Sequence, residues 1–181
     1  MSLASVIALA SDTGHNFSKI TKPVITLVAG FGVQGDAHAG KTVQHLSDKK
    51  KNPQAPNLRQ VHLIHSELFD ELAEQGIDVQ PGQMGENIVT RGIDLLGLAE
   101  GTQLKFPSGA VIQITGLRSP CKKLNTIHPN LLKAVVEKRA DGSVQMKSGV
   151  MSIVLESGDI HAGDGIQIVV PKGEHKPLQC V

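Results

Sequence analysis

The run VIQITGLRSPC, residues 111–121, combines the clearest strand pattern of the chain with a cysteine. Val, Ile and Thr, which strands favour, dominate Val111–Leu117. A proline stands immediately before Cys121, and proline is rarely accommodated inside a paired strand. The sequence therefore predicts that Cys121 lies in a loop at the end of a strand.

Outward from this run, short strand-like segments recur between Gly, Pro, Asn and Asp residues. The predicted strands are Val6–Ala10, Val24–Val28, Gln60–Ile64, Glu86–Thr90, Gln103–Phe106, Val111–Leu117, Met151–Glu156 and Gly165–Val170. Their order lacks the regular βαβ alternation of a doubly wound sheet. We therefore expect an α+β fold that is β-rich, with a barrel core of short strands and a few packed helices. In the last strand, alternation predicts that Ile166 and Ile168 both face the core.

Two stretches have the spacing of amphipathic helices. Ser66 is placed to cap Glu67–Gln75, and Gly76 is placed to end that helix. A second helix is expected after Pro129-Asn130, with apolar residues at helical spacing: Leu131, Leu132, Val135 and Val136.

The stretch Leu46–Leu58 contains two prolines and a lysine triplet, Lys49-Lys50-Lys51. Prolines and a run of like charges are typical of a surface loop. We predict a mobile loop whose lysines form a solvated tip.

Length and composition are those of a single globular domain spanning residues 1–181. The net charge of +1 argues against a protein that coats nucleic acid. No apolar run reaches the roughly 18 residues that cross a bilayer, and the apolar start Met1–Ala10 lacks the basic residues of a signal peptide. We read that start as a buried strand. Cys121 and Cys180 are too few for a disulfide scaffold and suit the cytoplasm, but their pairing stays open.

The thiol of Cys121 is the first candidate for chemistry. Arg118, Lys122 and Lys123 all lie within three positions of it. Neighbouring cations stabilise the thiolate, which is the form that attacks electrophiles and binds metals. A free cysteine is more commonly a small buried hydrophobe, but the flanking charges and Pro120 favour a functional thiol.

The glycine-rich segment Gly32–Lys41 is the second candidate. Its glycines can present backbone N–H groups to an anion, and Asp36, His38, Lys41 and the nearby His45 add polar side chains. The segment has neither the Walker A pattern nor the dinucleotide-binding pattern. Gly-Asp turns between strands are usually architectural, so this signal is weak by itself.

The segment Asn57–His65 adds Arg59 and two histidines. Alternation along the strand puts Arg59 on the face opposite His62, and it makes His62 and His65 point different ways. A two-histidine metal pair on this strand is therefore not expected. A zinc site that combines Cys121 with His38, His45, His62 or His65 is a minor alternative, because no Cys-x-x-Cys or His-Glu-x-x-His spacing supports it.

The turn Pro81–Ile88 brings Glu86 and Asn87 to the start of a strand. These two residues are either ordinary turn residues or hydrogen-bonding partners for a polar heterocycle.

Taken in order, five segments resemble the MOSC family, named for the C-terminal domain of molybdenum-cofactor sulfurases, and especially its small stand-alone bacterial members. The segments are Gly32–Gly40, Asn57–Ile64, Pro81–Leu96, Thr115–Cys121 and Gly149–Val169. The resemblance covers nearly the whole chain. It implies a β-rich fold that contains a barrel, and an association with the molybdenum cofactor or with sulfur relay. It also implies that Cys121, in its Arg-x-Pro-Cys element, carries sulfur or binds the metal.

The resemblance and the residue patterns together predict a cofactor pocket. Its expected residues are Asp36, His38, Lys41, His45, Arg59, Glu86, Asn87 and Arg118. Because pockets that combine cations with a thiol are typical functional sites, we expect His38, His45 and Arg59 to converge near Cys121.

The leading hypothesis is a molybdenum-cofactor-binding sulfur carrier or transferase that uses a persulfide on Cys121. The chain has no recognisable pyridoxal phosphate site, so sulfur would come from a partner such as a cysteine desulfurase. Two alternatives are a molybdenum-dependent reductase of N-hydroxylated compounds, with Cys121 as metal ligand and a separate redox partner, and a non-catalytic module that delivers the cofactor.

Overall fold

The computed structural model describes residues 4–181, so the first three residues of the predicted N-terminal strand lie outside the described residues. The strands are β1 (Ser5–Ser11), β2 (Ile20–Lys22), β3 (Val24–Val28), β4 (Gly32–Val33), β5 (Val61–His65), β6 (Ile88–Arg91), β7 (Gln103–Lys105), β8 (Val111–Leu117), β9 (Val136–Lys138), β10 (Val144–Met146), β11 (Val150–Glu156), β12 (Gly158–His161) and β13 (Gln167–Val169). The helical segments are α1 (Leu46–Lys51), α2 (Glu67–Glu74), α3 (Leu131–Ala134) and the short turns η1 (Leu95–Gly97) and η2 (Lys122–Thr126).

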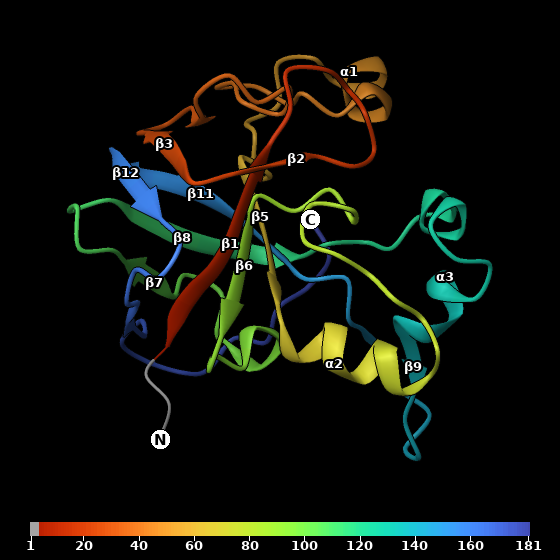
Figure 1. The fold of residues 1–181 in the computed structure, drawn as a ribbon. Helices are drawn as coiled ribbons and strands as arrows, with labels where there is room; N and C mark the ends of the chain where they lie inside the picture. The colour runs from red at the N-terminus through yellow and green to blue at the C-terminus, as the bar shows by residue number, and fades with distance from the viewer. Residues whose placement is uncertain (1–3) are drawn as a thin grey trace.

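Eight strands form the main sheet, in the order β13-β7-β8-β11-β5-β6-β1-β2 (Figure 1). Neighbouring strands are antiparallel except β5 and β6, which run parallel. A smaller sheet contains β12, β3 and β4, and β9 pairs with β10 as a separate hairpin. The fold is thus mixed α/β, rich in strands with few helices.

The main sheet has an open strand order. Across residues 4–181, no strand ladder joins β13 to β2. Backbone hydrogen bonds do connect the start of β1 to the segment before β13: Val6 N donates to Asp164 O at 2.9 Å, and Ile166 N donates to Ala4 O at 2.8 Å. The two ends of the sheet therefore approach each other, but the predicted barrel core is not confirmed as a closed ring.

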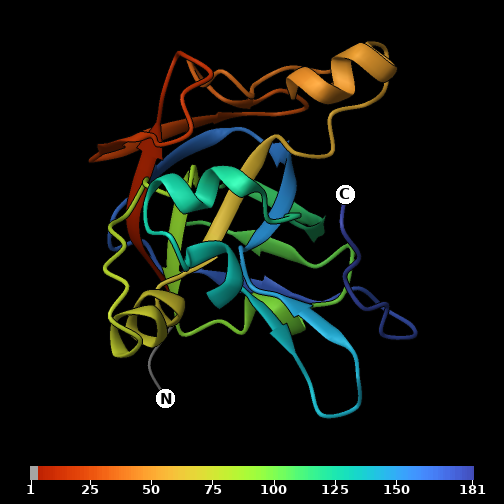
Figure 2. The same cartoon turned by 90° about the vertical axis from the view of Figure 1, so that its right-hand side faces the viewer.

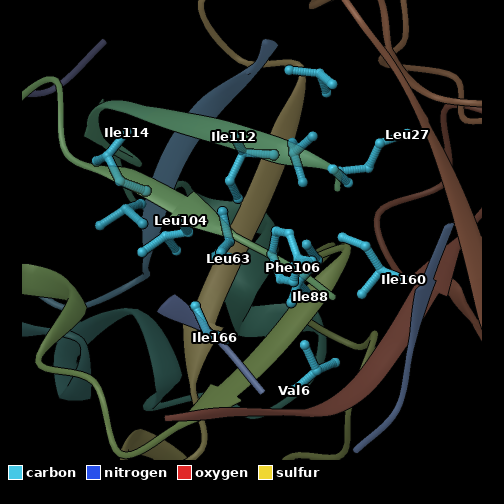
Figure 3. Close-up of a cluster of buried hydrophobic side chains, with 14 of the residues drawn as sticks. Val6, Leu27, Leu63, Ile88, Leu104, Phe106, Ile112, Ile114, Ile160 and Ile166 are labelled. Atoms are coloured by element: carbon cyan, nitrogen blue, oxygen red, sulfur yellow. The ribbon is translucent and has the colours of Figure 1, made fainter. Parts of the chain in front are cut away.

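The two faces of β5 enter two apolar clusters. Val61 and Leu63 pack in the larger cluster with Ile112 of β8, and Figure 3 shows Leu63 and Ile112 there among side chains from several strands. Ile64 points the other way and packs against α2 and α3. Alternation of side chains along this strand is therefore confirmed, and it places the helices on one side of the sheet.

Local sequence patterns predicted several elements with nearly the observed bounds. The predicted strands Val24–Val28 and Val111–Leu117 coincide with β3 and β8. The first predicted helix corresponds to α2, although the Ser66 side chain does not cap it. The Ser66 hydroxyl instead accepts a hydrogen bond of 2.7 Å from Arg91 Nε, so the predicted capping is wrong.

The second predicted helix is shorter than expected. It ends at Ala134, and Val136 begins β9, paired with Met146 of β10. Val is stiff at its branched Cβ and favours strands, so Val136 belongs to the hairpin and not to the helix.

The predicted inward orientation of both isoleucines near the C-terminus is half wrong. Ile166 is buried, whereas Ile168 is 39% exposed. The strand β13 begins only at Gln167 and is an edge strand, so Ile166 precedes the regular alternation and part of the strand is uncovered.

Candidate functional site

A cavity of about 690 Å³ lies beside the end of β8. Its walls come from four segments distant in sequence: His15–Lys19, the stretch around α1, the start of β5, and the loop containing Cys121. Six of the predicted site residues line it: His38, His45, Arg59, Asn87, Arg118 and Cys121. The structure thus brings together groups that the sequence separates by up to 83 positions, counted from His38 to Cys121.

The other three predicted residues lie outside the lining. Asp36 and Glu86 are buried behind it, and Lys41 is exposed. Glu86 accepts a hydrogen bond from Gly82 N through Oε1, while its Oε2 is buried without a hydrogen-bond partner. Burial raises the pKa of Glu86 and thereby favours the neutral acid. The hydrogen bond from the Gly82 N–H opposes this effect, because it favours the carboxylate.

Cys121 stands where β8 has ended and η2 begins. Its carbonyl oxygen accepts a hydrogen bond of 3.1 Å from Leu124 N, and its side chain is half-buried at the cavity wall. The preceding loop is tied to the strand beside it, because Arg118 N donates to Gly149 O at 3.0 Å. The thiol is therefore accessible from the cavity rather than sealed in the apolar core.

Cys121 and Cys180 are both free thiols. Cys180 is exposed, and its Sγ lies 3.2 Å from Met146 Sδ. The pairing left open by the sequence is therefore not formed in this structure.

Arg118 is the cation next to the thiol. Its Nη1 is buried without a hydrogen-bond partner among the described residues, and its Cζ lies 5.7 Å from the centre of the Phe17 ring. Burial lowers the pKa of Arg118, and its interaction with neighbouring Cys121 partly offsets this effect. Because buried donors are nearly always paired, this guanidinium has an unused donor for an anionic group.

Cations dominate the cavity although the whole chain is almost neutral. Asp48 is the single acidic residue among the lining residues, against six basic ones: Lys19, Lys51, Arg59, Arg118, Lys122 and Lys123. A cleft lined by one sign of charge focuses the electric field and concentrates ions of the opposite sign. The cavity is therefore suited to anionic ligands.

A buried ion pair supports the glycine-rich loop behind the cavity. Lys19 Nζ lies 2.9 Å from Asp36 Oδ2, and Asn87 Nδ2 donates to the same oxygen at 3.0 Å. Asp36 Oδ1 also accepts a 2.9 Å hydrogen bond from His38 N. Although burial by itself raises the pKa of Asp36, His38 and Lys19 hold it well below its usual range. Lys19 lies in no recognisable motif, so the sequence did not indicate it as a residue of the site.

His62 belongs to β5 and lines the cavity. Its Nε2 is 2.8 Å from the Ser148 carbonyl oxygen, and burial, then the charge of Arg118, lowers its pKa well below the ordinary value. The predicted separation of Arg59 from His62 is wrong, because both line the cavity. Arg59 precedes β5 and is turned by a hydrogen bond from its N–H to Asn57 Oδ1, so the alternation does not extend to it.

The segment predicted to be a mobile loop forms one wall. It contains the short helix α1, from which Leu46, Asp48 and Lys51 line the cavity, so the predicted loop is partly helical and its mobility stays a prediction. Arg59 Nη1 lies 3.4 Å from Asp48 Oδ2. Figure 2 shows α1 projecting away from the sheet, and none of its residues is buried.

The described part of the chain has neither a metal-binding group of side chains nor a membrane-spanning helix. Between residues 4 and 181, no three His, Cys, Asp or Glu side chains group closely enough to hold a metal ion. Within the same range, no helix is long and apolar enough to cross a membrane.

Comparison with known proteins identifies a family whose model matches most of the chain and a relative of similar sequence. The model of the MOSC domain matches residues 36–167. YuaD of Bacillus subtilis, grouped by name with metal-sulfur cluster biosynthesis proteins, is 30% identical over 171 residues, which cover 83% of each protein.

Solved structures agree with the fold. The crystal structure of YuaD from Bacillus subtilis superposes with a TM-score of 0.73 at 24% identity, covering 92% of this chain and 96% of that one. YiiM from Geobacillus stearothermophilus gives a TM-score of 0.65 at 20% identity, covering 92% of this chain and 75% of its own.

Proposed function

The chain belongs to the MOSC-domain family, and on that premise we propose that it is a sulfur carrier or transferase linked to the molybdenum cofactor, with Cys121 as the sulfur-carrying residue. One observation supports this most: a half-buried thiol opens into a cavity lined by cations, beside a guanidinium with an unused donor. The name of the relative YuaD also points to metal-sulfur chemistry.

The residues of the cavity fit the cofactor. The molybdenum cofactor is a pterin that carries a phosphate and a dithiolene, so it needs cationic and hydrogen-bonding partners. Arg59 and Arg118 can bind the phosphate, and His38 offers a polar group at the wall, whereas the Asn87 amide is already hydrogen-bonded to Ala10, Asp36 and His62. When bound, the cofactor supplies a metal that accepts sulfur and that a soft thiolate such as Cys121 can ligate.

Cys121 carries out the sulfur-accepting step. Its thiolate attacks the terminal sulfur of a donor persulfide, the S–S bond of the donor breaks, and the donor leaves as a thiolate. Cys121 then holds one additional sulfur atom. A nucleophilic acceptor takes that sulfur, and the electron pair of the breaking bond returns to the Cys121 thiolate. A cysteine desulfurase is the expected donor.

The first prediction is that Cys121→Ser abolishes sulfur loading and leaves the fold unchanged, because the hydroxyl is nearly isosteric but scarcely ionised near neutral pH. The protein is incubated anaerobically with a cysteine desulfurase and L-cysteine, and its intact mass is measured before and after reduction. We expect a gain of one sulfur atom that reduction removes.

Cys180→Ser is the matched control and should load like the wild type, since Cys180 contacts Met146 and does not line the cavity. Full loading of Cys121→Ser would contradict the thiol-centred function. The purified proteins are also analysed for molybdenum, and cofactor bound equally well by both variants would contradict Cys121 as a metal ligand.

The same thiol supports a second function, reduction of N-hydroxylated compounds with Cys121 as ligand of molybdenum. Turnover of such a compound by the molybdenum-loaded protein with an external electron donor, without any sulfur transfer, would favour this reductase over the carrier.

A further inference from the structure

We infer that the cavity accepts sulfur directly from a small oxyanionic sulfane donor of the thiosulfate class, with Arg118 binding the oxyanion while Cys121 takes the sulfur. This inference rests on the proposed sulfur-carrying function of Cys121. It adds an activity with a defined substrate class, for which no protein donor is needed.

The charge of the cavity supports an oxyanion as the substrate. Six basic residues line it; Lys19 pairs with Asp36 and Arg59 with Asp48, which leaves Lys51, Arg118, Lys122 and Lys123 without a carboxylate partner among the described residues. Lys122 and Lys123 directly follow Cys121. Such a surface attracts a dianion.

The buried donor of Arg118 places the oxyanion near the thiol. The guanidinium lies three positions before Cys121, both side chains line the same cavity, and its Nη1 has no hydrogen-bond partner in the described structure. A planar guanidinium binds oxyanions through two parallel hydrogen bonds. The group that occupies this position therefore carries its oxygens at Arg118 and its reacting atom beside Cys121.

The position of Cys121 allows a small donor to reach the thiol without a protein. The side chain is half-buried and opens into a cavity of about 690 Å³, of which the α1 segment forms one wall. A small dianion fits within this volume.

The reaction balances without a further oxidant or reductant. The Cys121 thiolate attacks the outer sulfur of thiosulfate, the S–S bond breaks, and sulfite leaves with the electron pair. Cyanide, used as a probe acceptor, then attacks the outer sulfur of the Cys121 persulfide. Thiocyanate forms, and the electron pair of the second S–S bond returns to the Cys121 thiolate.

The test measures formation of thiocyanate from thiosulfate and cyanide by the full chain, together with the intact mass after thiosulfate alone. We expect turnover and a gain of one sulfur atom, both lost in Cys121→Ser. Arg118→Gln should raise KM for thiosulfate by about tenfold or more, the effect of losing a charge-assisted contact, with a smaller effect on kcat. Arg118→Lys should partly restore KM.

Arg139→Gln is the matched control, because this exposed guanidinium lies in the turn between β9 and β10, outside the cavity lining. It should leave KM unchanged. If Arg118→Gln does not fold, Lys123→Gln gives the same readout from an exposed position.

The outcomes separate the inference from the proposed function. Loading by a cysteine desulfurase without any loading by thiosulfate overturns the inference and leaves the sulfur carrier intact. An Arg118→Gln variant with unchanged KM and reduced kcat overturns oxyanion binding at this residue. Loading by neither donor contradicts both proposals.

Discussion

Gly149 joins the Cys121 loop to the centre of the sheet, and its surroundings leave no space for a side chain. Its φ is 94°, and a Cβ there would lie 2.1 Å from Leu63 O and 2.9 Å from His62 Nε2. Its carbonyl oxygen also accepts the hydrogen bond from Arg118 N. The position of the thiol therefore depends on close backbone packing at this glycine.

We predict that Gly149→Ala lowers the free energy of unfolding by about 3 kcal/mol, since overpacking adds to an unfavourable backbone conformation. Equilibrium unfolding in urea measures the loss. The control is Gly142→Ala, which has a φ of 84° but no atom within 4 Å of the added Cβ, and should cost about 1 kcal/mol. Equal losses in the two variants would show that the close contacts at Gly149 do not matter.

At the scale of elements, α1 differs from the other helices because it serves the cavity and not the core. None of its residues is buried, whereas α2 buries Leu68 and Leu72 and α3 buries Leu131. Backbone pairing of Thr42 with Pro56 closes the segment at its base. Most helical stability comes from packing an apolar face, so α1 contributes little to the stability of the fold.

Replacing Leu46–Lys51 with a Gly/Ser sequence should therefore change the free energy of unfolding by less than about 1 kcal/mol, as surface changes do. The same replacement should raise KM for thiosulfate, because it removes three lysines, among them Lys51 of the wall, against one acid, Asp48. Thermal or urea unfolding and the thiocyanate assay check the two effects.

Leu131→Ala provides the contrast. This side chain is fully buried in the cluster under α3, so its loss should cost about 2–5 kcal/mol. If replacement of α1 is as costly as this, α1 has a structural role that its exposure does not suggest.

Across the whole molecule, three histidines link stability to pH: His62 is buried, His65 is half-buried and His45 is exposed. Burial lowers the pKa of His62 well below the ordinary value, and it also lowers the pKa values of His45 and His65. The unfolded chain then binds more protons than the folded chain below the ordinary histidine pKa of about 6.5. The stability from these neutral histidines is present above that pH and is lost as the pH falls.

We predict that the free energy of unfolding decreases between about pH 7 and pH 5, and that His62→Gln weakens this dependence. Gln can still donate to the Ser148 carbonyl oxygen but does not titrate. Urea unfolding at several pH values gives the difference between the two proteins, in which the opposite contribution of Glu86 cancels. Equal slopes would mean that His62 is not the titrating group.

Local patterns in the sequence determined the strands β3 and β8, the helix α2 and the placement of Cys121 at the end of a strand. Each of these depends on side-chain period, turn residues or a proline within a few positions, and such signals need no distant partner. The family resemblance likewise required only the order of the motifs.

Only the tertiary structure decided which of these groups meet. The cavity forms because the end of β8, the start of β5 and the α1 segment converge from distant parts of the chain. The buried pairing of Lys19 with Asp36, the unused donor of Arg118 and the hairpin of β9 and β10 all depend on such non-local packing. Burial and charged neighbours depend on how distant segments pack in the folded chain, so the periodicity of the sequence does not predict them.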